Sequence, residues 1–169
     1  MNYFELFEIP VSFKVDKGGL AQKYFALQKK YHPDFFTQSG EDEQAEVLEK
    51  SSAVNKAFKI LQNPDETIKY TLQLKGLLQE EEKYQLPPAF LMEVMDINEA
   101  LMDAKTEADQ EKLAEFKHQV LNLENEIYEP VKAIIENFKD GISTKEEMLQ
   151  VKEYYFRKKY LNRILAGID

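Results

Sequence analysis

The sequence predicts an all-α protein in two parts, and three features of the chain carry that prediction. Glycine and proline number only six each among 169 residues, so breaks in regular structure are few. Most strand-favouring residues recur at spacings of three and four, the period of a helix. Hydrophobic residues make up 43% of the chain, enough to bury a core. We expect a helical domain over residues 1–76, a linker over 77–87 and a three-helix bundle over 88–169.

Two long helices are expected in the first part, over about residues 17–31 and 43–62. Each has an apolar stripe at helical spacing, and the short polar loop between them predicts an antiparallel hairpin. His32 should leave the first of these helices, because a proline follows it. Two shorter helices are expected beside the hairpin, over about residues 4–9 and 64–75.

Three helices are expected after the linker, the first over about residues 89–104. Residues 106–109 resemble a capping box, so we expect them to begin the second helix. The apolar stripe of that helix continues to Phe138, and Pro130 inside it predicts a kink just before the proline. Residues 143–146 should open the last helix.

Composition and charge exclude several kinds of site. The chain has no cysteine and two histidines, so disulfides, thiolate-bound metals and histidine-rich metal sites are not expected, and neither is a cofactor. Residues 76–169 carry 12 Lys and Arg against 20 acidic residues, and this acidic half argues against nucleic acid as a partner. No apolar run reaches the ~18–20 residues that span a membrane. We therefore expect a protein of a reducing compartment, the cytoplasm.

His32 and Asp34 are the only pair that resembles a catalytic constellation. A helical enzyme could use them as acid and base, but no sequence signature supplies a nucleophile that the histidine would activate. They could also form a plain helix stop followed by a turn. Pro33 between them rigidifies the tip of the hairpin, so both side chains are presented with little ordering cost on binding.

Three lysines give the first long helix a local positive patch on an acidic protein. A patch of this kind is ordinarily a solvated helix face. Beside a rigid tip, it instead suits steering toward a negatively charged partner surface. The lysines are Lys23, Lys29 and Lys30.

Three blocks of the sequence resemble a J-domain in their order and spacing: Tyr-Phe-Glu-Leu-Phe at 3–7, Lys-Lys-Tyr-His-Pro-Asp at 29–34, and residues 54–61 followed by Asn-Pro. The resemblance implies a non-enzymatic activator of a DnaK/HscA-type heat-shock chaperone, whose ATP hydrolysis the His-Pro-Asp loop triggers. Phe35 departs from the family pattern, which usually has lysine there. The residues implied to bind the chaperone are Lys23, Lys29, Lys30, His32, Pro33 and Asp34.

The helix over 89–104 carries more apolar surface than one packing face requires. Leu91, Met95 and Met102 form a second arc, and Met92 and two acidic residues border it. Arcs rich in methionine are frequent at adaptable binding surfaces. The alternative is that another helix of the bundle covers this arc.

The whole chain is similar to the HscB/Jac-type co-chaperones of iron–sulfur cluster assembly, most distinctively at Ala-Phe-Leu-Met-Glu over 89–93. The resemblance implies that the C-terminal bundle binds the scaffold protein IscU and delivers it to the chaperone HscA. Met95 stands where leucine is expected, which conserves volume. Some relatives carry an N-terminal cysteine-bearing extension. The present sequence contains no cysteine, so we expect the shorter bacterial form. The positions implied to bind the scaffold are Leu91, Met92, Met95, Glu99, Asp103 and Phe156.

A general J-domain co-chaperone for other clients is the alternative function. Such proteins often carry a Gly/Phe-rich linker or a cysteine-rich zinc module. The sequence has neither of these features, which favours the dedicated co-chaperone.

Overall fold

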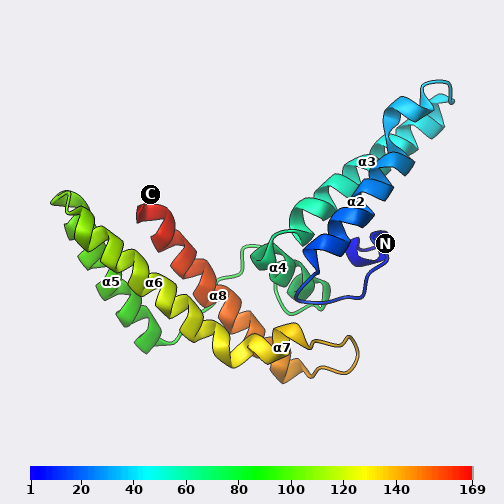
Figure 1. Ribbon diagram of the computed structural model, residues 1–169. Helices are drawn as coiled ribbons and strands as arrows, with labels where there is room; N and C mark the ends of the chain where they lie inside the picture. Colours follow the sequence, from blue (N-terminus) through cyan, green and yellow to red (C-terminus); the bar gives the residue numbers. More distant parts are fainter. Residues whose placement is uncertain (169) are drawn as a thin grey trace. The chain divides into compact units, whose positions relative to one another are not determined.

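A computed structural model describes the backbone of residues 1–168 and the side chains of residues 1–167. All regular structure in this part of the chain is helical, so the predicted all-α fold is confirmed (Figure 1). The chain forms two compact units. Unit 1 contains residues 1–74 and the short segment 138–142, and unit 2 contains the remainder. Unit 1 therefore includes a short segment from the second half of the chain.

Unit 1 is built on a hairpin of two long helices, α2 (Lys17–Tyr31) and α3 (Glu41–Leu61), which lie side by side in Figure 1. The short helix α1 (Tyr3–Leu6) precedes the hairpin, and α4 (Pro64–Leu74) follows it. The bounds of α2 agree with the sequence prediction, and α3 begins two residues earlier than expected. Three acidic residues in the first turn of α3 stabilise that earlier start through the helix dipole.

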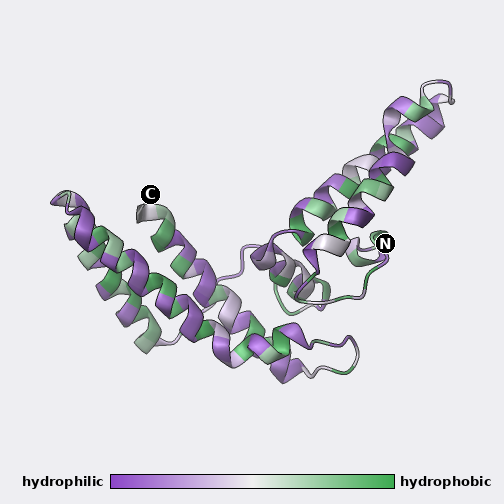
Figure 2. Ribbon diagram, viewed as in Figure 1, coloured by the Kyte–Doolittle hydropathy of each residue, from purple (hydrophilic) through white to green (hydrophobic). Residues whose placement is uncertain are grey.

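The core of unit 1 forms where α1 meets the inner faces of the hairpin. Green and purple segments alternate along each helix in Figure 2, as expected when one face is buried and the other is solvated. The hydroxyl of Tyr70 in α4 accepts a hydrogen bond from the backbone N–H of Tyr3 at 2.9 Å, which fixes α4 against α1. The buried cluster consists of Phe4, Phe7, Leu20, Val54, Ala57 and Leu61.

Unit 2 contains three long helices, α5 (Pro88–Thr106), α6 (Gln110–Tyr128) and α8 (Lys145–Ile168). Helix α6 packs against both α5 and α8, and α5 also contacts α8. A short helix, α7 (Lys132–Glu136), lies between α6 and α8. The largest fully buried side chains of the three long helices are Val94, Leu101, Val120, Val151 and Leu161.

The start of α6 differs from the sequence prediction. Thr106 is the last residue of α5, and its hydroxyl donates a hydrogen bond back to the carbonyl of Met102. The cap of α6 is Asp109, whose carboxylate accepts a hydrogen bond from the N–H of Lys112. The expected capping box at 106–109 is therefore wrong, because the hydroxyl group of Thr106 is hydrogen-bonded within the preceding helix.

The long second helix predicted through Phe138 is also interrupted. The residues around Pro130 form a 3-10 turn over Glu129–Val131, and α7 begins directly after it. Proline removes one N–H donor, and its ring clashes with the preceding turn. The proline therefore ends α6 instead of only bending it, and the apolar stripe continues across two separate helices.

Candidate functional site

The tip of the α2–α3 hairpin presents His32, Pro33 and Asp34 to solvent. His32 leaves α2 with extended dihedral angles (φ −67°, ψ 126°), as its position before a proline predicts. The side chains of His32 and Asp34 are 46% and 84% exposed. Pro33 begins a 3-10 turn that ends at Phe36, so the tip is a short rigid turn and not an extended loop.

The imidazole of His32 faces its own turn. Its Nδ1 atom accepts a hydrogen bond from the backbone N–H of Asp34 at 3.2 Å and lies 3.5 Å from the Asp34 carboxylate. The Phe35 ring meets the imidazole edge-on at 5.9 Å and is itself 70% exposed. The exposed imidazole and an exposed apolar ring therefore share this tip.

Gln44 of α3 holds the far side of the tip. Its amide nitrogen lies within hydrogen-bond distance of the backbone carbonyls of Phe36, Thr37 and Ser39, at 3.0–3.2 Å. One side chain thus reaches three carbonyls at the end of the turn, of which that of Phe36 also accepts from the backbone N–H of Ser39. Gln44 is not predictable from the sequence, since a glutamine in the first turn of a helix carries no signature of this contact.

The three predicted lysines are not equivalent. Lys29 and Lys30 are exposed near the tip. Lys23 is half-buried, and its ammonium donates a hydrogen bond to the carbonyl of Glu8 at 2.8 Å. A fourth cation was missed: Lys50 of α3, whose Nζ lies 5.3 Å from the centre of the Tyr31 ring. Lys50 also pairs with Glu46 of the same helix at 3.3 Å, so the positive surface beside the tip is carried mainly by Lys29 and Lys30 of α2.

The predicted scaffold-binding residues of α5 share one exposed side of that helix. Met92 and Met95 are 67% and 60% exposed, and Leu91 is half-buried beside them. Glu99 and Asp103 continue the same side one and two turns further along. We call these five residues, together with the exposed Met102, the α5 stripe.

Phe156 belongs to α8 and, unlike the exposed methionines of the α5 stripe, is buried. Its ring is 9% exposed and stacks on the ring of Tyr84 in the linker, with centroids 4.7 Å apart and planes inclined by 3°. Next to this stack, Lys152 of α8 pairs with Glu82 of the linker at 2.7 Å. Hydrogen bonding from Lys152 lowers the pKa of Glu82, and burial raises the pKa of Tyr84.

A groove joins Phe156 to the start of the α5 stripe. It has a volume of about 770 Å³ and lies between the linker, the N-terminal end of α5 and one side of α8. Leu91 lines it together with Phe156, so these two predicted residues border the same groove. No group of acidic or histidine side chains that could hold a metal ion occurs among the described residues. No helix within them is long and apolar enough to cross a membrane.

Comparisons with known proteins connect both halves of the chain to one family. Residues 86–169 match the family model described as the HSCB C-terminal oligomerisation domain. The HscB co-chaperone homologue of Psychromonas ingrahamii is 39% identical over 132 residues, which are 75% of this chain and 78% of the relative. The homologue of Vibrio vulnificus is 31% identical over 166 residues, 97% of this chain and 95% of the relative.

Two solved structures share the fold. Human co-chaperone HscB superposes with a TM-score of 0.83 at 30% identity, over 99% of this chain and 80% of the human one. Chaperone HscB from Vibrio cholerae superposes with a TM-score of 0.73 at 27% identity, over 99% of this chain and 97% of the other. The predicted resemblance to HscB co-chaperones is confirmed.

Proposed function

The chain belongs to the HscB family of co-chaperones, and we propose that it stimulates an HscA/DnaK-type ATPase and delivers an IscU-type iron–sulfur scaffold protein to it. We infer that this takes place in the cytoplasm. The single observation that carries the proposal is the exposed His32-Pro33-Asp34 tip at the end of a helical hairpin with adjacent lysines. The tip activates the partner's catalysis, and this chain supplies no catalytic residue of its own.

The tip suits recognition of a folded partner surface. Its turn is fixed by Pro33 and by the contacts of Gln44, so little conformational entropy is lost when it docks. The exposed Asp34 carboxylate accepts hydrogen bonds from the chaperone, and Lys29 and Lys30 attract an acidic face of it. The ATPase responds because the docked tip stabilises one of its conformations over another.

The α5 stripe suits a second, independent partner. Met92 and Met95 offer flexible, polarizable side chains to solvent, and such side chains adapt to an apolar surface. Glu99 and Asp103 add negative charge at the edge of this apolar area, where it orients a basic patch on the scaffold. Carrying both partners on one chain raises the effective concentration of the scaffold at the chaperone.

The tip is tested by the ATP turnover of a purified HscA-type chaperone with the wild-type chain, His32→Gln or Gln38→Ala. Gln38 is exposed in the same loop and serves as the matched control. We expect stimulation by wild type and Gln38→Ala, and its loss in His32→Gln. Undiminished stimulation by His32→Gln would refute the role of the tip. If His32→Gln loses stimulation but the wild-type chain does not bind the scaffold, the result would favour a general J-domain co-chaperone.

The α5 stripe is tested by combining Met92→Ala with Met95→Ala and titrating an IscU-type scaffold calorimetrically. Because these side chains are exposed, stability should change by less than about 0.5 kcal/mol. Scaffold affinity should fall about tenfold or more. The exposed Leu121 of α6 provides the control, Leu121→Ala, which should bind as wild type does. A loss of helical content in the methionine variant would instead assign these side chains to the core.

A further inference from the structure

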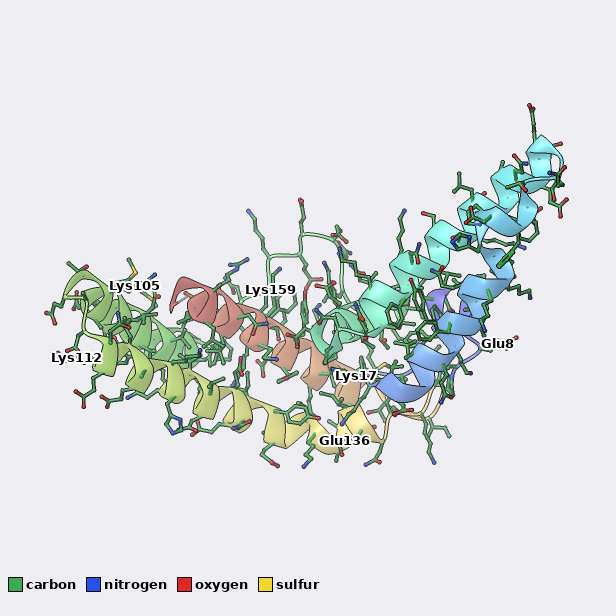
Figure 3. The ribbon with its side chains drawn as sticks, turned by 45° about the horizontal axis from the view of Figure 1, so that its top comes forward. Glu8, Lys17, Lys105, Lys112, Glu136 and Lys159 are labelled. Carbon is green, nitrogen blue, oxygen red and sulfur yellow. The ribbon has the colours of Figure 1, made fainter. Side chains whose placement is uncertain are left out.

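The groove beside Phe156 has a charge opposite to that of the α5 stripe. One side of α8 contributes Lys159 and Arg163 to its lining, and the linker contributes Lys83. Figure 3 shows Lys159 on the side of α8 that faces away from α6. The acid in the lining, Glu82, is already paired with Lys152. Three cations therefore line a groove in a half of the chain that is strongly acidic overall.

These cations are available to a ligand. Lys83, Lys159 and Arg163 are all exposed, and within residues 1–167 none of them has a carboxylate partner within ion-pair distance. The Lys159 ammonium lies 6.0 Å from the centre of the Phe156 ring, at the edge of the apolar floor of the groove. Leu86 and Leu91 complete that floor. A ligand that fits must therefore present negative charge directly beside an apolar group.

We propose that this groove binds an extended acidic segment of the scaffold protein, with a carboxylate at Lys159 and Arg163 and an adjacent apolar side chain on Phe156 and Leu91. The inference rests on the proposed function and extends it. A volume of about 770 Å³ is within the usual range of ligand sites and holds only a few residues of peptide.

The charge pattern also sets the orientation of the scaffold. Leu91 belongs to both the groove and the α5 stripe, so the two surfaces are continuous. The positive groove lies at the start of α5, and Glu99 and Asp103 lie further along that helix. A partner with one acidic and one basic region fits in one direction, and the reverse direction brings like charges together. A nucleic acid would instead be repelled by the acidic end.

The test is a calorimetric titration of an IscU-type scaffold into the full chain and two double variants of equal charge. One is Lys159→Glu with Arg163→Glu. The control is Lys117→Glu with Lys132→Glu, two exposed lysines on α6 and α7. We expect the groove variant to bind about tenfold more weakly and the control to bind within about twofold of wild type. High salt should reduce the difference between them.

Each other result overturns a specific claim. Equal scaffold binding by both double variants would refute the groove as a binding site for the scaffold, while leaving the proposed function intact. No scaffold binding by wild type would refute the proposed function, and the groove with it. If a short RNA binds the wild-type chain but not the groove variant, the groove is a site for a polyanion, and the proposed acidic peptide is wrong. If charge reversal lowers helicity, Lys159→Gln with Arg163→Gln repeats the comparison with an expected loss of about threefold.

Discussion

At the scale of single residues, the tip of unit 1 depends on a side chain outside the tip itself. The Gln44 amide lies within hydrogen-bond distance of three carbonyls, although it has only two hydrogens to donate, so these bonds share its two N–H groups. This arrangement holds the end of the turn after Asp34 against the first turn of α3. The rigidity of the tip is thus shared between Pro33 and Gln44.

Gln44→Ala should loosen the tip without unfolding unit 1. Removing these partly exposed hydrogen bonds should lower the free energy of unfolding by about 1 kcal/mol. Amide hydrogen exchange of residues 36–44 should become faster, and stimulation of the chaperone should weaken in parallel. Gln38→Ala is the matched control and should exchange as wild type does. Unchanged exchange in Gln44→Ala would mean that Pro33 alone holds the turn.

The ion pair between Glu82 and Lys152 makes the packing of the linker dependent on pH. Its hydrogen bond lowers the pKa of Glu82 below the ordinary value of 4.5. The ionised carboxylate therefore stabilises the folded state fully above that value, and the contribution is lost as pH falls through the lower folded-state pKa. The ammonium of Lys152 also lies 5.6 Å from the centre of the Tyr84 ring, so the pair supports the ring stack as well.

Glu82→Gln should therefore destabilise unit 2 near pH 7 and have little effect in strong acid. Urea unfolding of wild type and Glu82→Gln at several pH values measures this difference. We expect the two midpoints to converge as the pH falls below about 4.5. Glu81→Gln, at an exposed neighbouring position, should follow wild type throughout. A difference that stays constant with pH would show that the pair does not hold the linker.

At the scale of elements, the turn between α5 and α6 shows what a local pattern cannot predict. The residues from Thr106 to Asp109 contain two possible caps, and only packing decides which is used. Leu101 and Ala104 are buried in the bundle, and this burial extends α5 through Thr106. The chain then reverses through Ala108, which adopts a left-handed conformation with φ 54°.

Ala108→Gly should stabilise unit 2. A left-handed conformation costs a residue with a Cβ about 1–2 kcal/mol, and the extra freedom of glycine in the unfolded chain offsets part of the gain. We expect a net increase of about 0.5–1 kcal/mol in the free energy of unfolding. Ala114→Gly, at an exposed position inside α6, should lower it by about 1 kcal/mol. A destabilised Ala108→Gly would show that the turn is not strained.

At the scale of the whole molecule, the sequence predicts best what is encoded locally. The His32-Pro33-Asp34 tip follows from a proline at the end of an amphipathic helix. The exposed α5 stripe follows from helical periodicity. The contact of Lys23 with Glu8 and the stack of Phe156 on Tyr84 join distant parts of the sequence. No period or motif predicts such contacts, because they depend on how the helices and the linker pack.

In the proposed function, one chain connects a chaperone and its client through two separate surfaces. The direct measurement is ATP turnover of an HscA-type chaperone with this chain, with and without an IscU-type scaffold. We predict that adding scaffold increases the stimulation, and that His32→Gln and the Met92→Ala, Met95→Ala variant each abolish this increase. The methionine variant should keep the stimulation seen without scaffold. A scaffold-dependent increase that survives the methionine variant unchanged would contradict delivery of the scaffold through the α5 stripe.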